Sequence, residues 1–375
     1  MTIYIDTSSA VHGKAGLGRY AANLARELRA LLGDRLRIFQ NSLGRRGPLE
    51  GWSGPPPAGV HWGYRPWRGL VLARQALRLP FDGLLPGAAL FHATEHLLPP
   101  LRGVPTVLTV HDLIYERLPE HHKFMNYRYL KAAMPLFCRR ATAIIAISAH
   151  TRDDLVALYG LDPARITVIP EAAAPHFVQP SPERVAEVRA HHRLPARYAL
   201  TVGTIEPRKN LPRLLEACAP LLAEGSLDGL VIVGGRGWLT EGFDRALAAY
   251  PFRDRVLLPG YVADQDLPAV YAGARVTVQP SLYEGFGLPV LEAMACGSPV
   301  CASRTTSLPE VGGDAAMYLD PEDVGDMTAA IRRVLEDEAL AGAMRAGGLA
   351  RAARFSWRRT AEETAALYEQ VIRNG

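Results

Sequence analysis

The sequence is poor in cysteine and has no long apolar run, and both absences narrow the classes of protein that fit it. Its four cysteines are Cys138, Cys218, Cys296 and Cys301, and no two of them form a C-x-x-C pair. This sparse spacing excludes a disulfide framework and is typical of a reducing compartment. No run approaches the roughly 18 apolar residues that span a bilayer, and no signal-peptide pattern opens the chain. We therefore expect a cytoplasmic protein.

Charge is distributed unevenly along the chain. The net charge is +4, but residues 1–178 carry 21 Lys and Arg against 13 Asp and Glu, whereas the remainder carries 21 against 25. A basic half can face anionic lipid, nucleic acid or a phosphorylated substrate. The sequence has no basic run, aromatic RNA-binding motif or zinc-finger spacing, so we predict no nucleic-acid partner.

Short β-branched runs alternate with helical patterns along the chain, which predicts α/β domains with doubly wound parallel sheets. The length of 375 residues favours two such domains. A proline-rich segment near residue 180 is the best linker, so we predict an N-terminal domain over 1–179, a C-terminal domain over 180–356, and a final helix over 357–375 that packs back on the N-terminal domain. The expected strands cover residues 3–5, 36–39, 89–92, 106–110, 143–147, 166–169, 198–203, 230–233, 256–258, 276–279 and 300–302, and residues 41–66 are expected to form a loop.

Loops that follow the strands are where an open parallel sheet binds ligands. The segment Gly13–Arg19, which contains Gly16, follows the first strand, and its glycines would let the backbone approach an anion at a helix N-terminus. His111 and Asp112 follow the fourth expected strand, where such a pair can position a hydroxyl or carry a proton. A plain tight turn and a simple loop cap remain the alternatives for these two loops.

Two further loops carry stronger patterns. Arg208 and Lys209 follow the strand at 198–203, and side by side they suit a diphosphate. In the segment from Glu284 to Glu292, Pro289 suits the first turn of a helix, so the amides of residues 285–288 are free to bind an anion. The two carboxylates could be the acid and base of a glycosidase. The neighbouring diphosphate cradle favours a nucleotide-sugar instead.

The extended match around this E-x7-E motif, residues 280–300, resembles the family 4 glycosyltransferases of the GT-B fold. Segments 110–113, 202–211, 233–238 and 307–311 resemble the same family. The resemblance implies two Rossmann-like domains facing across a cleft, with the acceptor bound by the N-terminal domain. It also implies a retaining, metal-independent enzyme that transfers a hexose from a nucleotide-sugar donor to a glycan or a lipid-linked saccharide.

The same resemblance assigns roles to individual residues. Glu292 would hold the ribose hydroxyls and Glu284 a hydroxyl of the donor sugar, Lys209 with Arg208 would meet the diphosphate, and His111 would lie beside the donor sugar and the acceptor. Many family members carry Arg where this sequence has Thr204, so we expect Arg208 to take its place. The expected catalytic residues are His111, Glu284, Lys209 and Arg208. The expected donor-binding residues are Gly16, Thr204, Arg208, Lys209, Gly285, Phe286, Gly287, Leu288 and Glu292.

The subgroup with Gly-Thr-x-Glu-Pro-Arg-Lys-Asn favours mannose from GDP-mannose, in bacterial surface polysaccharide assembly. The alternatives are a sugar-nucleotide epimerase, a phosphorylase, a catalytically silent scaffold and a nicotinamide-dependent dehydrogenase, the last weakened by the missing Rossmann fingerprint. Residues 123–140 interleave aromatic residues with five cations. They predict either peripheral contact with the anionic inner face of the cytoplasmic membrane or a helix packed on its own sheet.

Two patterns imitate metal sites. Asp264-Gln-Asp266 resembles the D-x-D of other glycosyltransferases, but it directly precedes an expected helix and is interpreted as helix capping. The pairs His121-His122 and His191-His192 have no third ligand at a suitable spacing, so we interpret them as solvated loop residues. We therefore expect neither a metal nor another cofactor.

Overall fold

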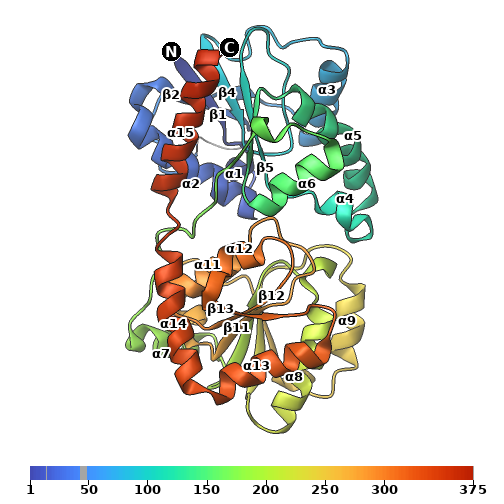
Figure 1. Cartoon of the computed structure of the whole chain (residues 1–375), viewed down its shortest axis with the longest axis vertical. Helices are drawn as coiled ribbons and strands as arrows, with labels where there is room; N and C mark the ends of the chain where they lie inside the picture. Colours follow the sequence, from blue (N-terminus) through green and yellow to red (C-terminus); the bar gives the residue numbers. More distant parts are fainter. Residues whose placement is uncertain (14, 43–48, 375) are drawn as a thin grey trace. The chain divides into compact units, whose positions relative to one another are not determined.

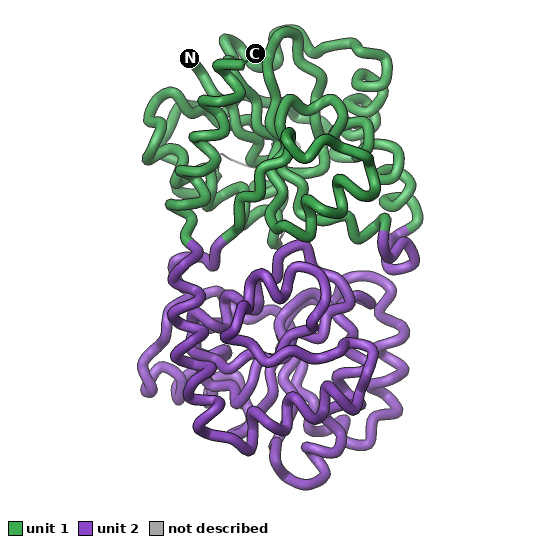
Figure 2. The backbone as a smooth tube through the Cα atoms, viewed as in Figure 1, with its two compact units in different colours: residues 1–116, 124–171, 356–375 green, residues 117–123, 172–355 purple. Residues whose placement is uncertain are grey.

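The structure, a computed structural model, describes residues 1–13, 15–42 and 49–374. Lys14, in the expected glycine loop, and residues 43–48, in the expected loop over 41–66, lie outside the described residues. Contacts divide the chain into two compact units (Figure 2). The first comprises Met1–Glu116, Phe124–Glu171 and Ser356–Gly375, and the second comprises Arg117–Lys123 and Ala172–Phe355. The chain thus enters the second unit after Glu171, a few residues before the expected boundary.

The first unit is built on a parallel sheet flanked by helices (Figure 1). Its strands are β1 (Thr2–Asp6), β2 (Leu36–Asn41), β3 (Ala58–Val60), β4 (Ala88–Ala93), β5 (Thr106–Val110), β6 (Ala143–Ala146) and β7 (Ile166–Val168). Its helices are α1 (Ser8–Val11), α2 (Ala15–Leu32), α3 (Tyr64–Ala76), α4 (Ile114–Arg117), α5 (Phe124–Arg140), α6 (Ala149–Tyr159) and α15 (Trp357–Asn374), with 3₁₀ turns η1 (Gly33–Arg35) and η3 (Pro163–Arg165).

The second unit repeats this plan. Its strands are β8 (Tyr198–Val202), β9 (Gly229–Val233), β10 (Val256–Gly260), β11 (Val276–Gln279), β12 (Val300–Ser303) and β13 (Ala316–Leu319). Its helices are α7 (Pro182–His191), α8 (Leu211–Ala223), α9 (Glu241–Ala248), α10 (Leu267–Gly273), α11 (Leu288–Ala295), α12 (Leu308–Gly312), α13 (Val324–Glu336) and α14 (Glu338–Ala352). Its 3₁₀ turns are η2 (Pro119–His121), η4 (Pro207–Lys209), η5 (Arg253–Arg255) and η6 (Gly313–Ala315).

Strand order in both sheets is that of a doubly wound fold. In the described residues the first sheet runs β3-β2-β1-β4-β5-β6-β7 and the second runs β10-β9-β8-β11-β12-β13, with all pairs parallel. The order reverses between β1 and β4 in the first sheet and between β8 and β11 in the second. Ligands bind at such reversals because successive loops diverge to opposite faces there. The expected fold class is therefore confirmed.

Two strands, β3 and β13, were not predicted from the sequence. β3 lies inside the expected loop over 41–66, where its residues Ala58, Gly59 and Val60 follow three prolines. A side chain at Gly59 would collide with the carbonyl oxygen of Gln40, so the close approach of β2 requires glycine at this position. β13 has the sequence Ala-Met-Tyr-Leu, with no β-branched residue and mostly half-buried positions. Neither strand has the composition from which strands are predicted.

The last helix, α15, completes the first unit. Figure 1 shows it alongside α2, and its side chains Trp357, Leu367, Tyr368 and Val371 are buried. The hydroxyl of Tyr368 lies 2.6 Å from Nδ1 of His92, a fully buried residue on β4. A helix that follows the entire second unit in the chain therefore contributes to the core of the first.

Candidate active site

Glu284 is the centre of a polar cluster at the strand-order reversal of the second unit. It follows β11, whereas Arg208 and Lys209 lie on η4 after β8. Lys209 Nζ lies 2.5 Å from Glu284 Oε1, and Arg208 Nη1 lies 2.6 Å from Oε2. Ser281 Oγ and Gln279 Nε2 also donate to Oε1, at 2.7 and 3.0 Å. The structure thus brings together the three charged residues that the sequence analysis selected from two separate loops.

Burial and mutual attraction set the charges of this cluster. Glu284 and Lys209 are both buried. Burial disfavours the Glu284 carboxylate, but the neighbouring Arg208 and Lys209 hold its pKa well below the usual range. Burial and the Arg208 guanidinium lower the pKa of Lys209, although Glu284 opposes this shift. Glu284 is therefore a fixed anion at neutral pH, clamped by two cations.

Glycines allow the loops after β8 and β9 to pack closely beneath this cluster. Gly203 has φ +155°, and a side chain there would press against the Lys209 methylenes, the nearest at 3.0 Å. A side chain at Gly234, which has φ +143°, would collide with the carbonyl oxygen of Gly203. Thr204, half-buried in the same loop, packs against Gly237. Small residues here let Lys209 lie along the backbone.

The turn before α11 is shaped for an anion. Gly287 stands at the N-cap of α11 with φ +112°, and Pro289 occupies the first turn. The hydroxyl of Ser307 donates to the carbonyl oxygens of Glu284 and Phe286, both at 2.8 Å, and so holds the loop before the helix. The first amides of a helix have no intrahelical acceptor and carry partial positive charge. Residues 285–288, whose amides are predicted to bind an anion, lie in the turn that leads into α11 and at its first position.

Thr306 is a site residue that the sequence analysis missed. It has φ +58°, a left-handed conformation that is rare for a β-branched residue. Its Oγ1 accepts a hydrogen bond from the Glu284 amide at 3.1 Å. Such strain clusters at functional sites. Ser281 and Gln279 were missed as well, because nothing in their local sequence shows that they converge on Glu284.

Glu292 is buried on α11, whereas Glu284 lies in the loop before that helix. Tyr271 on α10 donates its hydroxyl to Glu292 Oε2 at 2.9 Å. This contact fixes the carboxylate, which can accept further hydrogen bonds from a diol such as ribose. Tyr271 lies in a segment whose sequence carries no site pattern, so only the folded structure identifies it as the partner of Glu292.

In the first unit, His111 is held between two acceptors after β5. Its Nδ1 lies 2.9 Å from Oε1 of Glu171, and its Nε2 lies 2.9 Å from the carbonyl oxygen of Thr94. Burial opposes a charged imidazole, but the bonds and charges of Glu171, together with the Thr94 carbonyl, raise the pKa of His111. Both bonds form only when both nitrogens are protonated. The raised pKa and the two acceptors therefore favour the protonated form of His111, in which both nitrogens donate.

Tyr20 and His92, which lie close to His111, are kept uncharged by burial. The Tyr20 ring packs edge-on against it at 4.8 Å between centroids. Burial and the charge of His111 lower the pKa of His92 to about 3, and burial raises the pKa of Tyr20 well above its usual value. Asp112, the other member of the expected pair, accepts from the Ile114 amide at 3.2 Å and so caps the start of α4. The two residues thus have different roles: His111 is hydrogen-bonded through both ring nitrogens, and Asp112 caps a loop.

Gly16 lies in the first turn of α2, which begins at Ala15, and so is part of the helix rather than of a loop before it. Among the described residues, a side chain at Gly16 would meet no atom within 4 Å, whereas one at Gly18 would press against the carbonyl oxygen of Ser9 at 3.1 Å. Packing within the protein thus accounts for Gly18 only. The space beside Gly16 is open to a ligand, as its predicted role requires.

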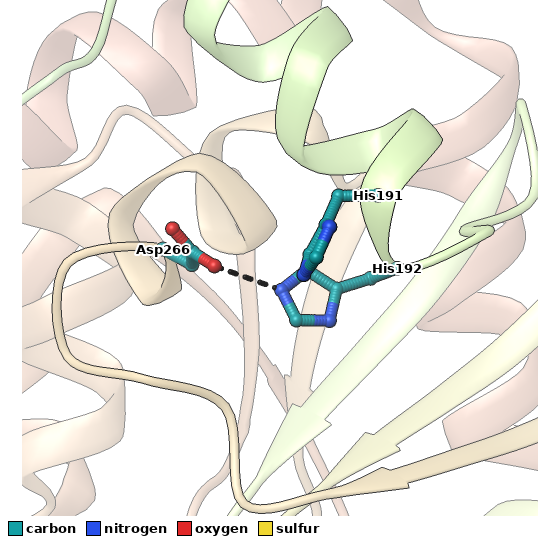
Figure 3. Close-up of side chains that lie close together, drawn as sticks. All are labelled: His191, His192 and Asp266. Carbon is teal, nitrogen blue, oxygen red and sulfur yellow. Dashed lines mark hydrogen bonds and ion pairs between the residues drawn. The ribbon is translucent and has the colours of Figure 1, made fainter.

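The interpretation of Asp266 as a helix cap is wrong. It occupies the N-cap position of α10, but its side chain makes no capping hydrogen bond. Instead it meets His192 of the pair His191-His192, and these three residues are the one group in the described chain with a ligand set for a metal (Figure 3). His121 and His122 lie elsewhere: the His121 carbonyl oxygen accepts from Trp238 Nε1 at 2.7 Å, and the His122 ring stacks on that indole.

Comparison with known proteins agrees with this geometry. The family profile described as Glycosyltransferase Family 4 matches residues 15–177, and that described as Glycosyl transferases group 1 matches residues 186–351. The chain is 36% identical over 282 residues to O-antigen chain mannosyltransferase B of Escherichia coli, which covers 75% of this chain and 74% of that protein. It is 34% identical over 274 residues to the serotype-specific mannosyltransferase WbdA of Escherichia coli, a match that covers 70% of this chain but 33% of WbdA.

Among solved structures, sucrose-phosphate synthase from Thermosynechococcus elongatus matches all of both chains with a TM-score of 0.77 and 22% identity. Together, the fold and the cluster around Glu284 define a glycosyltransferase of the GT-B fold. The chain belongs to glycosyltransferase family 4. None of the helices in the described part of the chain combines the length and the apolar character that a membrane span requires.

Proposed function

We propose that the protein transfers a mannosyl residue, with GDP-mannose as the first candidate donor, to a hydroxyl of a glycan or a lipid-linked saccharide in the assembly of a bacterial surface polysaccharide. The observation that carries the proposal is the Glu284 carboxylate clamped by Arg208 and Lys209 beside the N-terminus of α11. The activities for which the two Escherichia coli relatives are named support mannose and surface polysaccharide.

This arrangement suits a departing diphosphate. As the bond from the anomeric carbon to the phosphate oxygen breaks, negative charge grows on the diphosphate and positive charge on the sugar. Arg208, Lys209 and the first amides of α11 stabilise the diphosphate charge most strongly in the transition state. Glu284 accepts a hydrogen bond from a sugar hydroxyl, and Glu292 accepts from the ribose. Fixed protein cations can supply this stabilisation, so we propose that the reaction needs no metal.

Retention of the anomeric configuration is part of the proposal. The acceptor oxygen bonds to the anomeric carbon on the face from which the diphosphate departs, and the acceptor proton passes to a leaving phosphate oxygen. Support comes from His111, because both of its nitrogens are occupied by Glu171 and Thr94 and neither can receive that proton. His111 would then act through its charge rather than as a base.

A thermal-shift panel with UDP, GDP, CDP, dTDP, ADP and NAD tests the donor class, since a ligand of the folded state raises its stability. We expect a response to GDP in the presence of EDTA. Incubation with GDP-mannose and an acceptor glycan should then release GDP only when the acceptor is present, and the proton spectrum of the product should show the α configuration of the donor. A response to NAD alone, or an inverted product, would contradict the proposal.

We also propose that α5 contacts an anionic membrane, where a lipid-linked acceptor lies. One face of this helix is buried, but Phe124 and Met125 are 67% and 74% exposed, beside the exposed cation Arg128 and ahead of Arg139 and Arg140. Exposed apolar residues beside cations suit a lipid surface.

The protein should float with phosphatidylglycerol vesicles at low salt and not with phosphatidylcholine vesicles. The double variant Phe124→Ser, Met125→Ser should weaken this binding. Equal flotation of the double variant would remove α5 from the proposal.

A further inference from the structure

The end of α7 and the start of α10 bring together three potential metal ligands that are far apart in the sequence (Figure 3). His191 is the last residue of α7, His192 follows it, and Asp266 directly precedes α10. One ligand atom from each lies within 4.8 Å of the others. The spacing in the sequence shows no third ligand for the histidine pair, because Asp266 lies 74 residues after His192 and comes from the start of another helix.

Asp266 is oriented toward the histidines rather than toward its own helix. Its Oδ2 lies 3.0 Å from His192 Nε2, and its Oδ1 lies 2.5 Å from Arg184 Nη2. Only 12% of its side chain is exposed, and it makes no bond to the first amides of α10. Arg184 thus fixes one carboxylate oxygen and leaves the other facing the imidazoles. Such supporting hydrogen bonds orient the carboxylate ligands of metal sites.

The two imidazoles complete a nitrogen and oxygen donor set. The rings of His191 and His192 meet edge to face, with centroids 4.7 Å apart and an interplanar angle of 88°. The described structure gives the imidazole of His191 no hydrogen-bond partner. Rotation of this ring toward Asp266 therefore breaks no hydrogen bond. Two imidazoles and one carboxylate are a ligand set of zinc and related transition-metal ions, with a fourth position left for water. The carbonyl end of α7 adds a partial negative charge that favours a cation.

We propose that His191, His192 and Asp266 bind one divalent transition-metal ion, zinc as the first candidate, and that this ion links α7 to α10. The ion would take the place of the 3.0 Å contact between His192 Nε2 and Asp266 Oδ2. The hydrogen bonds of Glu284 and Lys209 in the described structure go to residues other than these three, so Zn²⁺ binding can be measured without the sugar transfer proposed above. Its test is therefore independent of that reaction.

Calorimetric titration of untagged, EDTA-treated protein with ZnCl₂ tests the proposal. We expect one Zn²⁺ bound per chain with a Kd in the micromolar range, a rise in Tm on saturation, and no comparable response to Mg²⁺, which prefers oxygen ligands. Co²⁺ bound at the same site should give the visible absorption bands of a nitrogen-ligated ion. Absence of Zn²⁺ binding at a hundred-micromolar concentration would overturn the site.

Variants locate the bound ion. His191 is exposed, so His191→Ala should fold normally and weaken Zn²⁺ binding by about tenfold or more, and His192→Ala and Asp266→Asn should do the same. His150→Ala is the matched control: His150 also lies near an aspartate, with Nε2 3.4 Å from Asp154 Oδ2, but in the first unit. Its Zn²⁺ affinity should equal that of the wild type. Unchanged binding in His191→Ala and His192→Ala, or loss of binding in His150→Ala, would place the ion elsewhere and overturn the proposal.

Discussion

Lys209 shows how a single buried charge can be kept ready for a ligand. Its ammonium group is buried against Glu284, and Gly203 leaves room for its methylenes. Burial lowers the pKa of Lys209, so the ion pair with Glu284 is what holds the proton in place before any substrate binds. A diphosphate that enters this site meets a cation whose position is already fixed, and little reorganisation is needed during the reaction.

Substitution Lys209→Ala should therefore lower kcat by about a hundredfold or more and raise KM much less, because the contact strengthens as the diphosphate departs. Initial rates with varied donor concentration give both constants. Arg332→Ala is the control, since Arg332 forms a half-exposed ion pair with Glu224 at 3.2 Å on the same unit. A change confined to KM would show that Lys209 binds the ground state and the transition state equally.

Glu292 is predicted to act on the donor before the chemistry. Glu292→Gln keeps the shape of the side chain and its bond from Tyr271 but removes the charge, so the Kd of the nucleoside diphosphate should rise about tenfold or more. Calorimetric titration measures this directly. Glu338→Gln, in an exposed ion pair with Arg275, is the matched change. Equal nucleotide affinity in Glu292→Gln and the wild type would refute the ribose assignment.

The pair His111 and Glu171 predicts a pH dependence of stability. Because the folded state raises the pKa of His111, the pair stabilises the protein fully below the unfolded value of about 6.5, and this contribution is lost as the pH rises through the folded pKa. Glu171→Gln should reduce the free energy of unfolding by about 1–3 kcal/mol near pH 6, and less at higher pH. Denaturant unfolding from about pH 6 to about pH 9 tests this. A difference that grows with pH would have the wrong sign.

The charged residues of the site could be predicted from the sequence because they lie in loops between a strand and a helix. The residues that hydrogen-bond to the site's carboxylates and backbone could not. Arg208, Lys209 and Glu284 were chosen because parallel strands end at one edge of a sheet. Tyr271 and Thr306 reach the same site from α10 and from the loop after β12, and their importance depends on side-chain directions that only tertiary packing sets. Asp266 was misinterpreted for the same reason, since its partners come from α7.

At the scale of secondary structure, the short turn before α11 depends on one backbone conformation. Gly287 has φ +112°, which side-chain-bearing residues rarely adopt, and a Cβ there would lie 2.5 Å from Leu308 Cδ2 on α12. The start of α11 and the packing of α12 are therefore coupled through this glycine.

Strands longer than three residues with β-branched composition were all predicted from the sequence. β3 and β13 lack that composition and pair only because their neighbours position them.

Gly287→Ala should lower the free energy of unfolding by about 1–3 kcal/mol and weaken nucleotide binding, because the backbone must leave the conformation that presents the amides of α11. Gly242→Ala is the matched control: Gly242 lies in α9, and a Cβ there meets no atom of the described residues within 4 Å. That change should leave nucleotide binding intact and stabilise the helix by up to about 1 kcal/mol. Thermal unfolding with and without GDP measures both effects. Parallel behaviour of the two variants would argue against a special role of Gly287.

For the molecule as a whole, the first unit is assembled from segments at both ends of the chain. α15 follows the second unit in sequence but packs on α2, and Tyr368 bonds the buried His92 of β4. The periodic apolar pattern predicted this helix, because it repeats over nearly five turns. Sequence patterns did not show that the segment Phe124–Glu171 of the first unit ends at Glu171, the partner of His111.

Tyr368→Phe should lower the free energy of unfolding by about 1–3 kcal/mol, because it leaves Nδ1 of the buried His92 without its partner. Tyr261→Phe removes a hydroxyl from a side chain that is 73% exposed and should change stability by less than about 0.5 kcal/mol. Denaturant titration compares the two. Similar losses in both variants would mean that the contact between α15 and β4 contributes little.

The late position of α15 also has a consequence for synthesis on the ribosome. Residues 172–355 emerge before residues 356–374, so every strand of the second sheet is available while the first unit still lacks its last helix. The N-terminal domain of a nascent chain usually folds first. Here the first unit cannot complete its packing until α15 has been made, after the whole of the second sheet. Until residues 356–374 have been synthesised, the apolar surface of α2 that α15 covers stays exposed.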